Sequence, residues 1–176
     1  MKLNLACGGR YMEGYVNVDW SANAKTDLMK DLFKFPYPWE DSSADEIQVH
    51  HFVEHIPHQL PGITQNGLVM FMEECHRIMK PGALMYVSHP HPLSASFWGD
   101  PTHCRNVHPM TWFYFNKAWR DASLGGVYDF KCDFEVVEQT SRLACPKEAD
   151  DATKEAMLTL IPGGVTECFS TLKALK

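Results

Sequence analysis

The residues closest to the N-terminus that can do chemistry lie in two neighbouring turns. Gly8 and Gly9 follow a short apolar run, and Asp19 ends the next one. Glycines let the backbone approach a ligand, and a carboxylate at a strand end can accept two hydrogen bonds from a ribose diol. The two turns therefore predict a pocket for an adenosine. The residues predicted to form it are Ala6, Cys7, Gly8, Gly9, Asp19 and Trp20.

Each of these residues also has a structural explanation. A Gly-Gly pair supports a plain tight turn, and Asp19 can cap the turn at Ser21–Lys25. Trp20 can pack on the adenosine, in the core or at an interface. The adenosine pocket is the interpretation that explains both turns together.

Two further segment ends add polar groups to the same predicted edge. Asp31 can accept a hydrogen bond from an adenine amino group, and Leu32 can flank the ring. The alternative is that Asp31 is an ordinary loop acid. His50 and His51 end a fourth apolar segment and are predicted to border the cofactor, one of them pointing into the cleft, because side chains alternate along a strand.

The segment His89–Tyr114 is rich in histidine, proline and aromatic residues and follows a fifth apolar segment. In open α/β sheets this edge borders the ligand crevice, so we predict that the segment forms the wall for a second substrate. A neutral imidazole can take a proton near pH 7. The predicted general bases are His89 and His103, and the predicted substrate-binding residues are His91, Trp98, Asp100 and Arg105. The alternative is a structural loop whose polar residues bond to one another.

Several histidines lie close together in the sequence and raise the question of a metal. His51 and His55 have the i,i+4 spacing that lets two imidazoles meet one ion. No HExxH or CxxC pattern surrounds them, and Glu54 is expected to point elsewhere on a helix. We therefore predict no bound metal.

Short apolar segments of the kind found in buried parallel strands supply the elements that must position these residues. The predicted strands are Lys2–Cys7, Tyr15–Trp20, Thr26–Asp31, Glu46–His51 and Ala83–Ser88. Apolar residues recur at helical spacing from Leu68 to Met79, and Lys80-Pro81-Gly82 is expected to end that helix.

The last third of the chain predicts a different arrangement. A helix is expected over Pro109–Arg120. Apolar and charged residues alternate from Tyr128 to Val136, which is typical of a half-exposed strand. Val165–Leu175 is predicted to be a closing strand, and Lys147–Leu160 either a surface helix or a flexible excursion.

This order of elements resembles the class I S-adenosylmethionine-dependent methyltransferases, in particular the small bacterial and phage group related to methyltransferase type 11. The resemblance covers nearly the whole chain. It rests on five segments in order, Leu3–Gly9, Val16–Asp19, Asp31–Pro38, Asp45–Ile56 and Glu74–Ala83. It implies a single α/β domain over residues 1–176, with a Rossmann-like sheet of parallel strands plus a terminal antiparallel pair. It also implies S-adenosylmethionine as cofactor and methyl transfer to a small molecule or a saccharide or lipid precursor.

The chain departs from the family pattern in two respects. Its first motif has one glycine fewer than the fullest pattern. Residues 8–14 and 21–25 are also too few for parallel crossovers, which need about a dozen residues. The first crossover helices are therefore predicted to be reduced or missing. One sheet face near the N-terminus would then be uncovered, and we predict a homo-oligomer formed through it.

Other functions stay open. The same cofactor can be cleaved rather than used for transfer, and the chain can be a non-catalytic binding module or partner subunit. A nicotinamide-dependent dehydrogenase also uses a glycine-rich turn and a strand-end acid, but GxGxxG is absent. The acceptor atom (oxygen, nitrogen or carbon) is not predicted.

Composition limits the partners. The net charge is −6 and no dense Lys/Arg cluster is present, which disfavours a long nucleic acid. No run approaches the roughly 18 apolar residues of a membrane span. The six cysteines are scattered without CxxC spacing, as in reduced proteins. We expect a soluble cytoplasmic protein.

Overall fold

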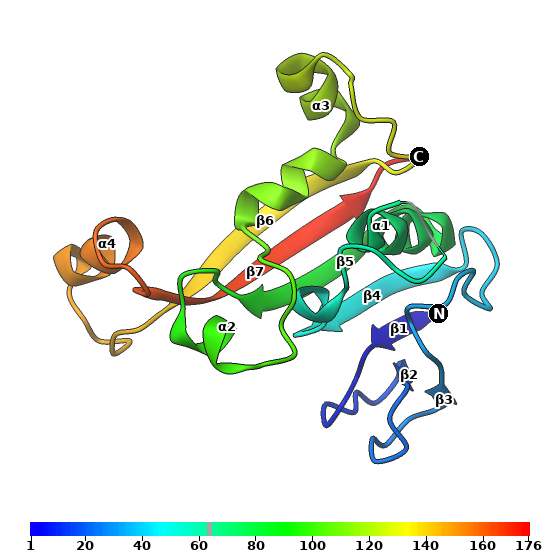
Figure 1. Cartoon of the computed structure of the whole chain (residues 1–176), viewed down its shortest axis with the longest axis horizontal. Helices are drawn as coiled ribbons and strands as arrows, with labels where there is room; N and C mark the ends of the chain where they lie inside the picture. The colour runs from blue at the N-terminus through cyan, green and yellow to red at the C-terminus, as the bar shows by residue number, and fades with distance from the viewer. Residues whose placement is uncertain (63–64) are drawn as a thin grey trace.

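The computed structural model describes residues 1–62 and 65–176, and within them the chain is built around a seven-stranded sheet (Figure 1). The strand order is β3-β2-β1-β4-β5-β7-β6. The first five strands run parallel, and β7 is antiparallel to both β5 and β6. This confirms the predicted α/β sheet with its terminal antiparallel pair. The strands are β1 (Lys2–Leu5), β2 (Val16–Asp19), β3 (Leu28–Met29), β4 (Ala44–His50), β5 (Met79–Pro90), β6 (Phe134–Leu143) and β7 (Val165–Ala174).

The core lies on one face of this sheet. Leu3 and Leu5 of β1 pair with Ile47 and Val49 of β4, and all four side chains are fully buried. Helix α1 (Gly67–Ile78) contributes its apolar stripe to the same core, as its sequence period predicted. Its N-terminus is capped by Asn66, which accepts a hydrogen bond from the Leu68 N–H. The chain passes directly from α1 into β5.

The three connections between the first four strands contain no helix. Residues 6–15, 20–27 and 30–43, all of them described, form loops and turns only. This confirms the prediction that the first crossover helices are missing. A short 3-10 helix, η1 (Val53–His55), follows β4 and precedes α1.

The second face of the sheet is polar rather than apolar. Lys2, Glu46 and Gln48 form a hydrogen-bonded row, with Lys2 Nζ 2.9 Å from Glu46 Oε2 and Gln48 Nε2 2.8 Å from Glu46 Oε1. His50 continues the row, with Nε2 3.0 Å from Gln48 Oε1 and Nδ1 3.0 Å from Ser88 Oγ. A sheet whose side chains alternate in this way can leave one face in water, so the missing helices do not expose an apolar surface.

The region after β5 corrects one predicted helix. The helix expected over Pro109–Arg120 is two helices, the 3-10 helix η2 (Pro109–Phe115) and α3 (Lys117–Leu124). Asn116 separates them, because its extended backbone ends η2 while its side chain accepts the Trp119 N–H and starts α3. A short helix α2 (Ala95–Gly99) precedes them.

The structure also corrects the strand predicted from Tyr128. Strand β6 begins at Phe134, opposite Ala174, where β7 ends. Residues before Phe134 therefore have no strand to pair with, and Phe130 instead stacks on Phe115 with 5.7 Å between ring centroids.

The excursion between β6 and β7 contains a surface helix, α4 (Asp151–Thr159), which is one of the two predicted alternatives (Figure 1). None of the helices in residues 1–62 and 65–176 has the length and apolar character needed to cross a bilayer. All six cysteines lie in the described residues and none forms a disulfide.

Candidate functional site

A cavity of about 670 Å³ opens at the carboxyl ends of β1 and β2. In open α/β sheets this edge is where ligands bind. Seven of the residues predicted to bind cofactor line it. The lining residues are Ala6, Gly8, Asp19, Trp20, Lys30, Asp31, Leu32, Phe33, His51, Phe52, His55 and Thr102.

Two hydrogen bonds join the residues just after β1 to the end of β2, and the first of them runs from the Cys7 N–H to the Val18 carbonyl oxygen at 3.0 Å. The Gly8 N–H donates to Asp19 Oδ2 at 2.8 Å, and Asp19 Oδ1 accepts from the Ser21 N–H at 2.8 Å. Gly8 has a φ of 49°, and a Cβ there would meet no atom within 4 Å. Two backbone donors thus hold the Asp19 carboxylate at the cavity wall, and each of its oxygens keeps a lone pair for a further donor.

The opposite wall is aromatic. The rings of Phe33 and Phe52 are stacked at 5.6 Å between centroids, with 16° between their planes. Leu32 beside them is buried, and Asp31 Oδ1 accepts from the Phe33 N–H at 2.9 Å. An apolar slot with a carboxylate at its edge is suited to a heteroaromatic ring that carries an amino group.

His51 directly follows β4 and has a left-handed backbone conformation, with φ 50°. Non-glycine residues adopt this region rarely, and functional sites are enriched in them. Its Nε2 is 2.7 Å from Glu167 Oε1 and its Nδ1 is 3.3 Å from Glu54 Oε1. Glu54 first, and Glu167 after it, raise the pKa of His51, while burial opposes the shift.

A second cavity, of about 550 Å³, shares His51 and His55 with the first. Two of the residues predicted for catalysis or substrate binding, His103 and Asp100, line it. The other lining residues are Arg10, Glu54, Pro90, Ser96, Arg142, Thr166, Glu167 and Phe169. The two cavities therefore adjoin across two imidazoles.

Three residues predicted to bind cofactor lie outside both cavities. His50 points to the second face of the sheet, where it lines a separate small hollow. Cys7 is buried, with Sγ 3.7 Å from the Lys25 carbonyl oxygen. Gly9 belongs to the turn that the Arg10 N–H closes on the Cys7 carbonyl oxygen at 2.7 Å. Of the two histidines, His51 is therefore the one that points into the cleft.

Four residues predicted for catalysis or substrate binding also lie outside the second cavity. His89, expected to be a base, is fully buried against Trp112, with Nδ1 3.0 Å from the Pro90 carbonyl oxygen. Arg105 is buried too, and donates to the carbonyl oxygens of Ile56 at 3.0 Å and Pro57 at 2.9 Å. It fixes the loop rather than a substrate.

The remaining two, Trp98 and His91, form hydrogen bonds within their own loop. Trp98 is 70% exposed and its Nε1 donates to the Pro92 carbonyl oxygen at 3.0 Å. His91 accepts from the Leu93 N–H at 3.3 Å and lies beside His108, with 5.9 Å between ring centroids.

Sequence reasoning missed the polar residues at the border between the cavities. Glu54 was expected to point away from the histidines, but its Oε1 is 3.3 Å from His51 Nδ1 and 4.0 Å from His103 Nε2. Thr102 and Glu167 were not singled out either. The Asp-Pro-Thr-His-Cys-Arg run was the one available signal for Thr102, and β7 gave none for Glu167.

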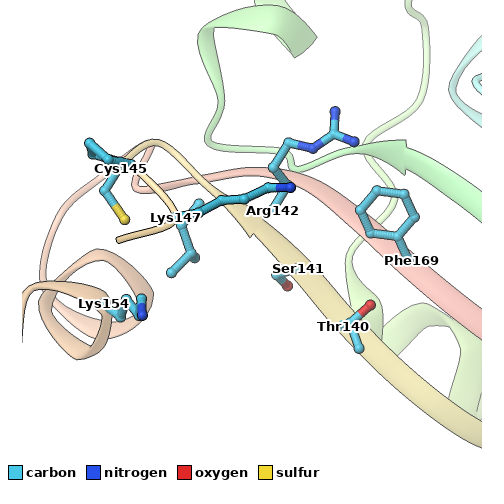
Figure 2. A pocket seen from close by; sticks show the side chains of 9 residues that line it. Thr140, Ser141, Arg142, Cys145, Lys147, Lys154 and Phe169 are labelled. Atoms are coloured by element: carbon cyan, nitrogen blue, oxygen red, sulfur yellow. The ribbon is translucent and has the colours of Figure 1, made fainter. Parts of the chain in front are cut away.

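A third cavity, of about 550 Å³, lies beside β6 and the loop that leads to α4 (Figure 2). Its basic lining residues are Arg142, Lys147 and Lys154. Arg142 also lines the second cavity, and its Nη1 is 2.6 Å from Glu167 Oε2. Arg142 therefore lies between this cavity and the second one, paired with an acid of the second.

Comparison with known proteins supports the fold. No family model and no curated protein matches the chain. A SAM-dependent methyltransferase from Archaeoglobus fulgidus is similar over 98% of this chain and 85% of its own, with 20% identity and a TM-score of 0.60. An S-adenosylmethionine-dependent methyltransferase from Mesorhizobium loti covers 98% of this chain and 89% of its own, with 14% identity and a TM-score of 0.54.

The [4+2]-cyclase SpnF is similar as well, over 99% of this chain and 75% of its own, with 13% identity and a TM-score of 0.56. Identities this low establish the fold alone. The chain therefore has the fold of the class I S-adenosylmethionine-dependent methyltransferases, as the sequence resemblance implied. The chemistry must be argued from the site.

Proposed function

We propose that the protein is an S-adenosylmethionine-dependent methyltransferase whose acceptor is a small molecule or a saccharide or lipid precursor. One observation carries the proposal. Gly8 and Asp19, at the tips of neighbouring strands, line one cavity together, and this cavity adjoins a second across His51 and His55. A methyl donor in the first cavity and a methyl acceptor in the second can then meet end to end.

The residues of the first cavity fit the cofactor. The Asp19 carboxylate would accept the ribose hydroxyls, and the Phe33–Phe52 pair would flank the adenine. Asp31 would accept from the adenine amino group, and Gly8 would lie under the amino-acid end. When bound, the cofactor supplies a methyl group activated by the positive charge on sulfur.

The protein's contribution is mainly to align the acceptor and exclude water. Holding two reactants in line can supply about 7 to 11 kcal/mol of the barrier. Arg105 ties the loop after α2 to the segment after η1 through the carbonyl oxygens of Ile56 and Pro57. His103 reaches the second cavity with Nε2, so it is the remaining candidate for accepting a proton from the acceptor.

The second cavity also supports the proposed acceptor class. Arg10 and Arg142 line it together with the acids Asp100 and Glu167. Such a lining suits a polar acceptor with hydroxyl or anionic groups. We therefore propose that Arg10 and Arg142, rather than Arg105, contact the acceptor.

The first prediction concerns Asp19. Calorimetry with S-adenosylmethionine, S-adenosylhomocysteine and NAD should show binding of the first two and not of NAD. Asp19→Ala should weaken binding of both by at least about tenfold, or roughly 1.4 kcal/mol, because the ribose loses its acceptor. Asp121→Ala, an exposed acid on α3, is the matched control and should bind as the unaltered protein does.

Product analysis separates methyl transfer from the other functions. Incubation with acceptor mixtures should release S-adenosylhomocysteine. Methylthioadenosine instead would indicate cofactor cleavage, and tight binding without any product would indicate a non-catalytic module. Unchanged affinity in Asp19→Ala would contradict the assignment of the first cavity.

A further inference from the structure

Three potential metal ligands converge where the two cavities meet. They are Glu54 and His55, in η1, and His103, in the loop after α2. One ligand atom from each lies within 4.8 Å of those from the other two. The rings of His55 and His103 are 4.7 Å apart between centroids. Two imidazoles and a carboxylate are the donor set that divalent transition metals prefer.

The carboxylate of Glu54 is buried without the partners it needs. The residue is 1% exposed, and among the described residues neither oxygen has a hydrogen-bond donor. His51 Nδ1 lies 3.3 Å from Oε1, close enough for an ion pair but outside hydrogen-bond geometry. A buried carboxylate whose oxygens accept no hydrogen bond is costly, even with an imidazole nearby. A cation bound beside it would compensate that cost.

The hydrogen bonds of His103 leave its Nε2 ready to coordinate an ion. Its Nδ1 is 2.7 Å from the Phe97 carbonyl oxygen, which can only accept, so Nδ1 carries the proton. Nε2 then has a free lone pair, directed to the side where Glu54 lies 4.0 Å away. Ligating histidines in metal sites are held in this way by an outer carbonyl or carboxylate.

His55 is held in the same tautomer by a longer relay. The Thr102 hydroxyl donates its one proton to Asp100 Oδ1, at 2.6 Å. Thr102 Oγ1 is also 3.0 Å from His55 Nδ1, so that nitrogen must be the donor. The Nε2 lone pair of His55 is therefore free as well. Asp100 Oδ2 lies 3.6 Å from His103 Nε2, at the edge of this cluster.

We propose that Glu54, His55 and His103 bind a divalent transition-metal ion at the border of the two cavities. Ligands of one ion are about 3 to 3.5 Å apart, given bonds of about 2.0 to 2.2 Å. The present spacing is wider, so the imidazoles would turn inward by about 1 Å on binding. This proposal differs from the sequence analysis, which predicted no bound metal.

The ion's function rests on the proposed methyl transfer. Its open positions would face the second cavity, where an acceptor hydroxyl could coordinate. Coordination lowers the pKa of a hydroxyl and fixes its direction. In the ion-bound protein, His103 would act as a ligand and the metal, rather than its imidazole, would activate the acceptor.

Metal binding can be measured without any cofactor. The full chain, freed of metal with a chelator, would be titrated with Mn²⁺ by calorimetry and with Co²⁺ by visible absorption. We expect one ion per chain. His103→Ala and Glu54→Gln should each weaken binding at least tenfold. His58→Ala removes an exposed imidazole elsewhere in the same segment and should leave the affinity unchanged.

Three results would overturn the proposal. These are the absence of saturable binding, a cysteine–Co²⁺ charge-transfer band, or equal affinity in the triad variants and the unaltered protein. Should Glu54→Gln fail to fold by circular dichroism, His55→Ala and His103→Ala decide the question. Asp19→Ala should keep the ion, so failure of the cofactor assignment and failure of the metal site can be told apart.

Discussion

Asp19 shows how one side chain can satisfy a structural and a functional explanation together. Its carboxylate accepts the Ser21 N–H and so caps the following turn, which is the structural role that the sequence left open. It also accepts the Gly8 N–H from the loop after β1. These bonds orient the group without exhausting its lone pairs. A side chain held in this way loses little further freedom when a ligand binds.

His50 predicts how stability depends on pH. Burial, followed by Arg10 and His51, lowers the pKa of His50 to about 4, while Glu167 opposes the shift. The unfolded chain then binds a proton that the folded chain does not, so stability falls as the pH drops from about 6.5 towards 4. His51, whose pKa is raised, contributes in the opposite direction.

We therefore expect His50→Gln to flatten the loss of stability on acidification. Between pH 7 and pH 5 the fall in Tm should shrink by about 2 to 4 °C, or about 1 kcal/mol after allowance for solvent screening. Thermal melts at both pH values check this. His58→Gln serves as the control, and an unchanged slope in His50→Gln would contradict the prediction.

The sequence could identify strand-end residues but not the direction of every side chain. Turn chemistry is local, so the sequence could point to Gly8, Asp19 and Asp31, which line one cavity in the structure. His89 and His103 are chemically identical, and their places depend on how β5 and the following loop pack. A buried glutamate in one turn of 3-10 helix, such as Glu54, has no sequence signal at all.

At the scale of elements, the side-chain amides of Asn4 and Asn17 hold the β1–β2 connection in place where a crossover helix is missing. Asn17 Oδ1 accepts from Asn4 Nδ2 and from the Met12 N–H, each at 2.8 Å. Its Nδ2 donates to the Met12 carbonyl oxygen at 3.0 Å and to Asp27 Oδ2 at 2.8 Å. The β1–β2 loop is thereby tied to the sheet by hydrogen bonds rather than by apolar packing.

Asn17→Ala should consequently destabilise the protein by about 2 to 3 kcal/mol, because buried groups lose their partners. Urea unfolding measures the change. Asn23→Ala, at an exposed position in the next turn, should cost less than about 0.5 kcal/mol. Equal effects of the two substitutions would show that the network is dispensable.

Most helices and strands were predictable because the spacing of apolar residues within each segment indicates which residues are buried. The exceptions depended on distant residues. The alternation from Tyr128 is real, but a strand needs a neighbour, and β7 ends opposite Phe134. The break at Asn116 was visible in principle, since asparagine is a strong helix N-cap.

At the scale of the whole molecule, self-association through the second sheet face stays a prediction. That face carries polar groups such as Glu46 and Gln48, so an interface there would depend on hydrogen bonds and charge. We expect a dimer at micromolar concentration that weakens as salt is raised. Sedimentation velocity tests this, and a monomer at low salt would contradict it.

The position of β7 bears on how the protein folds during synthesis. In the sheet formed by the described residues, β6 pairs with β7 alone, and β7 also covers the outer edge of β5. A nascent chain that has emerged only to residue 164 therefore displays a bare strand edge on β5 and an unpaired β6. Such edges invite aggregation. Translation must therefore proceed through Ala174 before β5 and β6 gain the strand that lies between them.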